Sequence, residues 1–82
     1  MSEHFLIDGT LEEKKYNKVY NILIKDEKDN THSLLVLDKY LIDTIKKYFV
    51  IGTKVRCGGY FSNKVQIVNS IDFLNNNLNV EE

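Results

Sequence analysis

Apolar and polar residues alternate over much of this chain, which predicts β-strands with one buried face. The alternation is clean over residues 4–11 (HFLIDGTL) and residues 19–25 (VYNILIK). A polar stretch follows each of them: EEKKYNK is expected to form a loop, and DEKDN a turn. The positions expected to face inward from these two strands are Phe5, Ile7, Gly9, Leu11, Tyr20, Ile22 and Ile24.

Three more strands are predicted farther along. Residues 32–38 (HSLLVLD) are almost continuously apolar, whereas residues 53–61 (TKVRCGGYF) and 64–74 (KVQIVNSIDFL) alternate. The residues SN join the last two, which predicts a tight hairpin. The inward positions expected in these last two strands are Val55, Cys57, Gly59, Phe61, Val65, Ile67, Ile71 and Phe73.

Between the third and fourth strands the hydrophobic period changes to that of a helix. In DKYLIDTIKKYFVIG the apolar residues fall at i, i+1, i+4, i+7 and i+8, which is one stripe of an amphipathic helix. Asp38 is suited to the N-cap position, and Gly52 follows the expected end. The stripe consists of Leu41, Ile42, Ile45, Tyr48 and Phe49.

Three strands, a helix and two strands is the element order of the OB-fold, a five-stranded Greek-key barrel. We therefore predict one all-β domain over residues 1–74, with one α-helix between the third and fourth strands, and a flexible polar and acidic tail over residues 75–82. Gly9 and the pair Gly58-Gly59 are expected to supply the bends that a small barrel needs. An SH3-like barrel is the alternative, but a helix after the third strand argues against it.

Composition and charge narrow the class of protein. The chain has 82 residues, 43% hydrophobic and 28% charged, as expected for one small globular domain. It has a single cysteine, no long apolar run and no basic leader, so we expect a cytoplasmic protein. The net charge of −1 is uneven, because residues 44–71 carry five cations and no acid. Such an asymmetry can mark a surface for an anionic partner.

Two stretches resemble a known family. LIDTIKKYFVIGTKVRCGGYF is similar to the helix-to-strand passage of bacterial single-stranded DNA-binding proteins, through an aliphatic helix start, the pair Tyr48-Phe49, and the spacing of Gly52, Val55 and Gly59. FLIDGTL resembles their first strand. Single-barrel primosomal replication proteins and the smallest subunit of replication protein A are matched almost as well. The resemblance implies an OB-fold that binds single-stranded DNA, or RNA, in replication, recombination or repair.

On this interpretation a nucleic acid would lie across the outer face of the second and third strands. Single-strand binding needs aromatic rings for bases and cations for phosphates. Tyr16 and Tyr60 are the expected stacking residues, and Arg56, on a strand, is the strongest phosphate candidate. The predicted nucleic-acid contacts are Lys14, Lys15, Tyr16, Lys18, Asn21, Lys25, His32, Lys54, Arg56, Tyr60 and Lys64.

A protein-binding module is the second hypothesis: an OB-fold accessory subunit of a replication or mobile-element complex. The near-neutral charge, the lack of tryptophan and the apolar outer face expected on the second and third strands favour it. Alternation predicts an apolar outer patch of Leu23, Leu34 and Val36 as its interface. On either hypothesis we expect a homo-oligomer or a complex with a replication protein, because one small barrel offers few contacts.

Catalysis has little support in the sequence. There is no His-x-Glu, no Cys-x-x-Cys and no phosphate-binding loop, and the acids are scattered. His4, His32 and Cys57 could in principle meet around a metal, but Cys57 is expected in the core. We therefore expect neither an enzyme nor a bound cofactor or metal, and no membrane partner.

Overall fold

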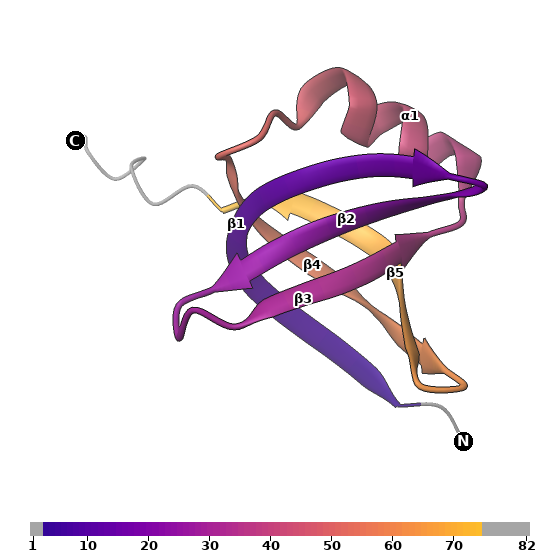
Figure 1. Ribbon diagram of the computed structural model, residues 1–82, viewed down its shortest axis with the longest axis horizontal. Coiled ribbons are helices and arrows are strands. Elements are labelled where there is room, and N and C mark those ends of the chain that lie inside the picture. Colours follow the sequence, from indigo (N-terminus) through magenta and orange to yellow (C-terminus); the bar gives the residue numbers. More distant parts are fainter. Residues whose placement is uncertain (1–2, 75–82) are drawn as a thin grey trace.

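A computed structural model describes residues 3–74 of the chain, and the predicted tail over residues 75–82 lies outside them. Five strands and one helix follow one another in the predicted order (Figure 1). No helix in the described part of the chain is long and apolar enough to span a membrane. The elements are β1 His4–Asn17, β2 Val19–Asp26, β3 Thr31–Val36, α1 Lys39–Tyr48, β4 Lys54–Ser62 and β5 Val65–Phe73.

The strands form a closed barrel in the order β1-β2-β3-β5-β4, and β4 pairs with β1 to complete it. All pairings are antiparallel except that of β3 with β5. The long β1 serves two partners, since residues 4–10 pair with β4 and residues 9–17 pair with β2. This is the five-stranded Greek-key barrel of the OB-fold. The predicted fold class is confirmed.

Glycines lie where two strands approach too closely for a side chain. A Cβ on Gly9, where β1 changes partner, would fall on the Lys25 carbonyl oxygen and within 2.8 Å of Ile24 Cγ2. A Cβ on Gly59 would fall on the carbonyl oxygen of Ile67 in β5. Of the glycines predicted to bend the strands, Gly9 and Gly59 are therefore required sterically, because backbone atoms cannot move aside as a flexible side chain can.

A β-bulge at Glu12 lets β1 run farther than predicted. Glu12 has no partner in β2, and a bulge both increases the twist and reverses the face of the residues that follow. β1 then continues to Asn17, so the predicted loop over residues 12–18 is wrong. Lys18, with φ at 70°, makes the turn into β2 by itself. The prediction failed because a run of charged residues in a protruding hairpin has the composition of a loop.

A second bulge, at Asn69, changes the faces of β5. Ile67 and the exposed Val65 lie on the outer side, contrary to the prediction, and Val68 is buried in the core instead. Phe73, at the end of the strand, is half-exposed, and its ring stacks on Phe49 with a centroid distance of 4.2 Å.

The turn between β4 and β5 consists of Asn63 and Lys64, one residue later than predicted. Their φ values are 52° and 70°, and Ser62 pairs with Val65 across them. Two consecutive residues with positive φ form the type I′ turn that closes a two-residue hairpin. The predicted tight hairpin is confirmed.

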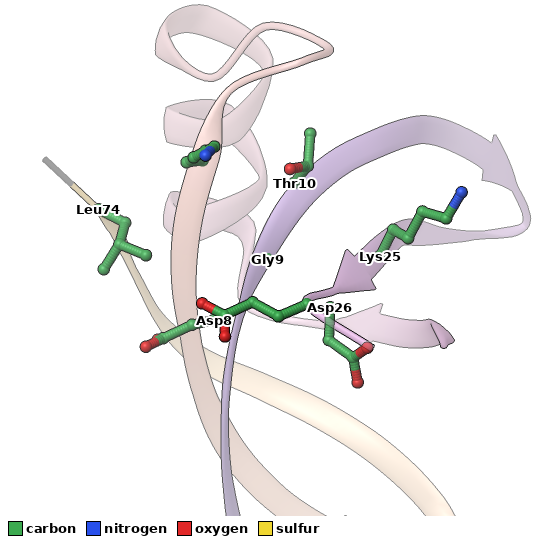
Figure 2. A pocket seen from close by; sticks show the side chains of 8 residues that line it. Asp8, Gly9, Thr10, Lys25, Asp26 and Leu74 are labelled. Atoms are coloured by element: carbon green, nitrogen blue, oxygen red, sulfur yellow. The ribbon is translucent and has the colours of Figure 1, made fainter. Parts of the chain in front are cut away.

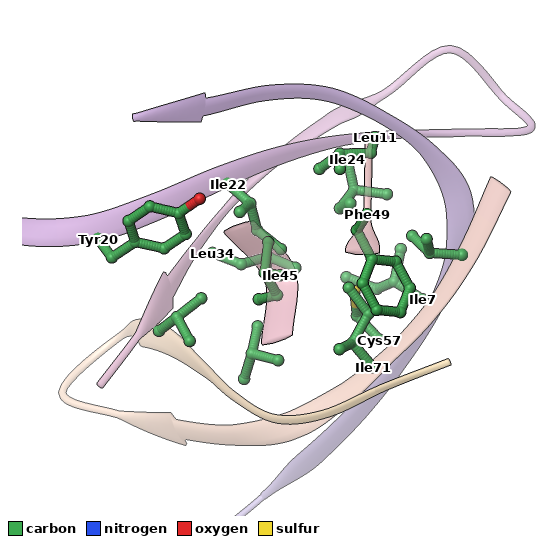
Figure 3. Close-up of a cluster of buried hydrophobic side chains, with 13 residues drawn as sticks. Ile7, Leu11, Tyr20, Ile22, Ile24, Leu34, Ile45, Phe49, Cys57 and Ile71 are labelled. Atoms are coloured by element: carbon green, nitrogen blue, oxygen red, sulfur yellow. The ribbon is translucent and has the colours of Figure 1, made fainter. Parts of the chain in front are cut away.

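The core is the interior of the barrel (Figure 3). The inward face predicted for β2 is confirmed, because Tyr20 is 4% exposed and Ile22 and Ile24 are fully buried. Cys57 is buried among them, and burial raises the pKa of its thiol to about 12. The cluster consists of Ile7, Leu11, Tyr20, Ile22, Ile24, Leu34, Val36, Ile45, Phe49, Val55, Cys57, Val68 and Ile71.

Helix α1 lies across one end of the barrel (Figure 1) and inserts Ile45 into the core. Its predicted N-cap is confirmed, because an Asp38 carboxylate oxygen accepts the Leu41 N–H at 3.0 Å. Phe49, directly after the helix, is also buried. Tyr48, in the last turn of the helix, is 60% exposed, so its predicted place in the buried stripe is wrong.

Candidate nucleic-acid interface

Six side chains line up across the outer surface of the barrel, and we call them the outer band. Strand register places successive members next to one another, from the second half of β1 through β2, β3, β5 and β4 to the first half of β1. Five interstrand spacings give this path a length of about 24 Å around the barrel, which it encircles, because it begins and ends on β1. In that order the members are Lys15, Asn21, Leu35, Ile67, Tyr60 and His4.

The outer band is apolar in the middle and polar at its ends. Ile67 is 8% exposed but does not belong to the core cluster, since it lies outside the barrel between Leu35 and Tyr60. Leu35 and Tyr60 are partly exposed, and the end members Lys15 and His4 are exposed. An aromatic ring beside apolar side chains, with a cation at one end, can stack a base and bind a phosphate.

The face of β3 that points outward differs from the prediction. Leu34 and Val36, predicted as an exposed interface, are 0% and 1% exposed and belong to the core, so that prediction is wrong. The reason is the register, which sets Leu34 opposite the buried Ile22. Leu35 lies on the outer side instead, and Leu23 lies there as predicted; both are partly exposed. The apolar run over residues 34–37 shows no alternation of its own, so only the polar Thr31 and Ser33 before it indicate which face points outward.

Lys14 is bonded to the helix and does not point toward the outer band. Its Nζ donates to the Phe49 carbonyl oxygen at 2.7 Å and lies 3.5 Å from that of Ile45. A cation at the last carbonyls stabilises the C-terminal end of α1. Tyr16 lies on this same face of the hairpin, opposite Tyr20, because the bulge at Glu12 reverses the alternation. Its ring is 69% exposed, away from the outer band.

Two more predicted contact residues, His32 and Lys25, lie beside acidic side chains at the turn between β2 and β3. His32 Nε2 lies 2.8 Å from Asp26 Oδ2, while Asp26 Oδ1 accepts two backbone N–H groups of the turn, both at 2.9 Å. These hydrogen bonds, with that of His32 the largest contribution, lower the pKa of Asp26 to about 2. Lys25 Nζ lies 3.7 Å from an oxygen of Asp29. These residues stabilise the turn.

Arg56, the predicted phosphate ligand, already binds a carboxylate. Its Nε and Nη2 donate to the two oxygens of Asp8 at 2.7 and 2.9 Å. The hydrogen bond to Arg56 is the main reason why the pKa of Asp8 is lowered. On the other side of Arg56 the register places Asp72. This arginine therefore lies between two acids.

A surface hollow of about 170 Å³ lies beside Gly9, where β1 bends (Figure 2). Asp8 and Asp26 line it, and both carboxylates are already bonded, to Arg56 and His32 respectively. The described residues of its lining include no aromatic side chain. The hollow, to which Lys54 also contributes, therefore does not suit the stacking of a base.

The residues considered for a metal site are in different places. His4 is exposed at the end of the outer band, His32 is bonded to Asp26, and Cys57 is in the core. Within residues 3–74 no three His, Cys, Asp or Glu side chains come together as metal ligands.

The structure thus brings together part of the predicted contact set. Lys15, Asn21 and Tyr60 lie on the outer band, and Lys18 and Lys64 lie in the turns that follow β1 and β4. The other predicted residues lie on other faces of the barrel or are bonded to neighbouring groups: Lys14, Tyr16, Lys25, His32, Lys54 and Arg56.

Three members of the outer band were not predicted from the sequence as nucleic-acid contacts: His4, Leu35 and Ile67. A signal for Leu35 was available, since Thr31 and Ser33 are polar at the alternate positions of the same strand. Those two residues point to the outer face. His4 and Ile67 could be found only from the register of β1, β4 and β5.

No protein-family model matches this sequence, and none of the curated proteins compared with it is significantly similar. Solved structures are similar. Two crystal forms of Rim1, the mitochondrial single-stranded DNA-binding protein of S. cerevisiae, match with TM-scores of 0.83 and 0.77 at 16% identity, over 93% of this chain and 97% of theirs. A selenomethionine-labelled crystal of Rim1 gives 0.79 at 15% identity. The chain therefore has an OB-fold of the form found in a mitochondrial single-stranded DNA-binding protein.

Proposed function

We propose that this protein binds single-stranded nucleic acid along the outer band, in particular single-stranded DNA with little sequence preference. The observation that carries the proposal is the unbroken line of stacking, apolar and cationic side chains across the strands of an OB barrel. Rim1, which has the same fold, is a single-stranded DNA-binding protein by its description. The process would be DNA replication, recombination or repair, served by binding without catalysis.

Each part of the outer band has a role in this proposal. A base stacks on the ring of Tyr60, sugars and a second base contact Leu35, which packs beside the buried Ile67, and Asn21 offers hydrogen bonds. Phosphates are held at the ends and turns by the three cations Lys15, Lys18 and Lys64. Three phosphate contacts on a single strand give a salt dependence of log K against log[salt] with a slope of about −2. One barrel would then bind weakly, and a homo-oligomer would bind more tightly through avidity.

Fluorescence anisotropy with labelled oligo-dT tests the proposal. Tyr60→Ala is expected to raise Kd about 5- to 150-fold, because stacking of one base contributes about 1–3 kcal/mol, while Tyr60→Phe retains most of the affinity. The control is Tyr40→Ala on α1, which removes another exposed tyrosine, 80% exposed, and should leave Kd unchanged. Absence of binding at tens of micromolar protein in low salt refutes the function. Equal losses for Tyr60→Ala and Tyr40→Ala refute the site.

A second function is favoured by the apolar residues beside the outer band. Val19 is 40% exposed and Leu37 is 52% exposed, and Leu23 lies on the same outer face. Exposed apolar side chains that gather on one face are typical of protein interfaces. On this alternative the barrel is an accessory subunit that binds another protein, or a second copy of itself, through β2 and β3.

Charged substitutions distinguish the two functions. Leu23→Glu with Leu37→Glu should disrupt oligomers or partner binding, measured by light scattering, if this surface is a protein interface. Thr44→Glu on α1 is the control for added charge. Loss of assembly with unchanged oligo-dT affinity supports the protein-binding function. Loss of oligo-dT affinity in a protein that remains monomeric supports binding of single-stranded nucleic acid.

A further inference from the structure

Beside the outer band lies a charged row that the proposed function does not use. Asp8 in β1, Arg56 in β4 and Asp72 in β5 are neighbours by register. We call them the acidic triplet, because two carboxylates surround one guanidinium. Arg56 donates to both oxygens of Asp8, at 2.7 and 2.9 Å, which leaves the charge of Asp72 uncompensated within the row.

Arg56 of the acidic triplet lies on the same strand as Tyr60, the stacking residue of the proposed function. Along β4, outward residues follow one another from Tyr60 through Gly58 to Arg56 and Lys54. Arg56 is four residues from Tyr60, about 13 Å along the strand. Without the two acids, a nucleic acid that stacks on Tyr60 would find a second cationic path down β4, at right angles to the outer band.

The row between the two features carries no charge. It consists of Leu6, which is 66% exposed, Gly58 and Ser70. This row offers no charged group to repel a phosphate, so the exclusion of phosphate from this part of β4 rests on the acids beside Arg56. A phosphate that approaches Arg56 meets a guanidinium whose Nε–H and one Nη2–H already bind Asp8, with a second acid on its far side.

We propose that the acidic triplet excludes nucleic acid from the part of β1, β4 and β5 around Arg56, with Asp8 masking Arg56 and Asp72 repelling phosphate, and so restricts the bound strand to the outer band, which crosses the same three strands at His4, Tyr60 and Ile67. The inference rests on the proposed function for the course of the strand. It makes Asp8 and Asp72 determinants of where a nucleic acid binds, although neither contacts it.

Neutralising the acids should unmask the arginine. Asp8→Asn with Asp72→Asn is expected to lower Kd for oligo-dT in low salt and to steepen the salt slope by about 0.7, the value of one added phosphate contact. The ratio of the wild-type Kd to the variant Kd should then fall about 2.6-fold between 50 and 200 mM salt. Adding Arg56→Gln to the same variant should abolish the gain.

Two controls make the result specific. Glu12→Gln with Asp43→Asn changes the net charge equally, on the bulge of β1 and on α1, and should not reproduce the steeper slope. An equal gain in this control overturns the proposal, because net charge alone would explain it. A salt slope that is shallower by about 0.7 in Arg56→Gln alone also overturns it, since Arg56 would then already contact phosphate.

A measurement without DNA separates this inference from the proposed function. The Arg56 Nε–H resonance, followed by NMR during titration with pyrophosphate, should stay in place in the wild-type protein and move in Asp8→Asn with Asp72→Asn. If oligo-dT does not bind but this pattern holds, the proposed function fails while the anion exclusion stands. Movement in the wild-type protein, or in neither protein, refutes the exclusion.

Discussion

Lys14 and Lys15 are adjacent in β1 but should have opposite roles, and replacing each by methionine tests this. Lys14 Nζ donates to the Phe49 carbonyl oxygen at 2.7 Å, beyond the last turn of α1, whereas Lys15 lies on the outer band with an exposed side chain. Methionine keeps much of the aliphatic stem and removes the ammonium group in both cases. The pair therefore compares the same chemical change on two faces of one strand.

The magnitude for Lys14→Met follows from its contacts. A hydrogen bond from a charged group contributes about 1.5–3 kcal/mol, and a cation at a helix C-terminus about 0.3–1 kcal/mol. Because water can replace the ammonium at this partly buried site, we expect a loss of about 1.5 kcal/mol. For a domain of this size that lowers Tm by about 6–12 °C. Lys15→Met should change stability by less than about 0.5 kcal/mol, because its contact with Glu13, at 3.8 Å, is exposed.

Thermal unfolding followed by circular dichroism measures the first effect, and anisotropy with oligo-dT measures the second. Lys15→Met should raise Kd in low salt and reduce the salt slope by about 0.7, while Lys14→Met should leave the slope unchanged. The reasoning is refuted if Lys14→Met retains the wild-type Tm and loses affinity as Lys15→Met does. Lys14 would then belong to the binding surface and not to the helix end.

Three further predictions concern the barrel. Gly59→Ala should lower the free energy of unfolding in urea by about 3 kcal/mol or more, because its Cβ would fall on the Ile67 carbonyl oxygen. Gly52→Ala should lower it by about 1 kcal/mol, because φ is 96° there but space is free. Equal losses would contradict the steric argument. The pKa of Asp26, about 2 against 3.9 for an unperturbed Asp, means that its carboxylate stabilises the fold above pH 4 and that this contribution is lost as the pH falls toward 2. The stability difference between the wild-type protein and Asp26→Asn should therefore shrink from pH 5 to pH 2.5, and a constant difference would contradict it. Cys57, fully buried with its thiol pKa raised to about 12, should react with a thiol reagent at pH 8 no faster than the barrel opens, and rapid labelling of the folded protein would show an exposed thiol.

Elements defined by local pattern could be predicted from the sequence. The stripe through Ile45 and the N-cap at Asp38 lie within a dozen residues, and the structure confirms both except for Tyr48. The alternation of β2 likewise determines which of its side chains are buried. These signals are local because a helix or a half-buried strand repeats its own period.

Bulges could not be predicted in the same way. Glu12 and Asn69 are ordinary polar residues, and each is unpaired because the strands on either side are fixed by closure of the barrel. Each bulge reverses the faces of the residues on one side of it, so Tyr16 lies away from the outer band and the inward face predicted for Ile67 was wrong. The face of a strand on the far side of a bulge is a property of the whole sheet.

The candidate site depended on pairing between distant strands. Alternation alone predicted that Arg56 points outward, and it does. The carboxylate that binds it, Asp8, is 48 residues away, and only the register of β1 with β4 makes them neighbours. Lys14 shows the same limit, since its carbonyl partner at Phe49 is 35 residues away. Residue types indicated which groups could bind an anion, but not which of them were already bound.

The division of β1 between two partners has a consequence for the order of folding. Its second half joins β2 across the single residue Lys18, so this hairpin closes a very short loop at little entropic cost. Its first half pairs with β4, where His4 meets Tyr60 across 56 positions of chain. We expect the β1–β2–β3 meander to form early and barrel closure by residues 4–8 to come last, so that substitutions in that segment mainly accelerate unfolding.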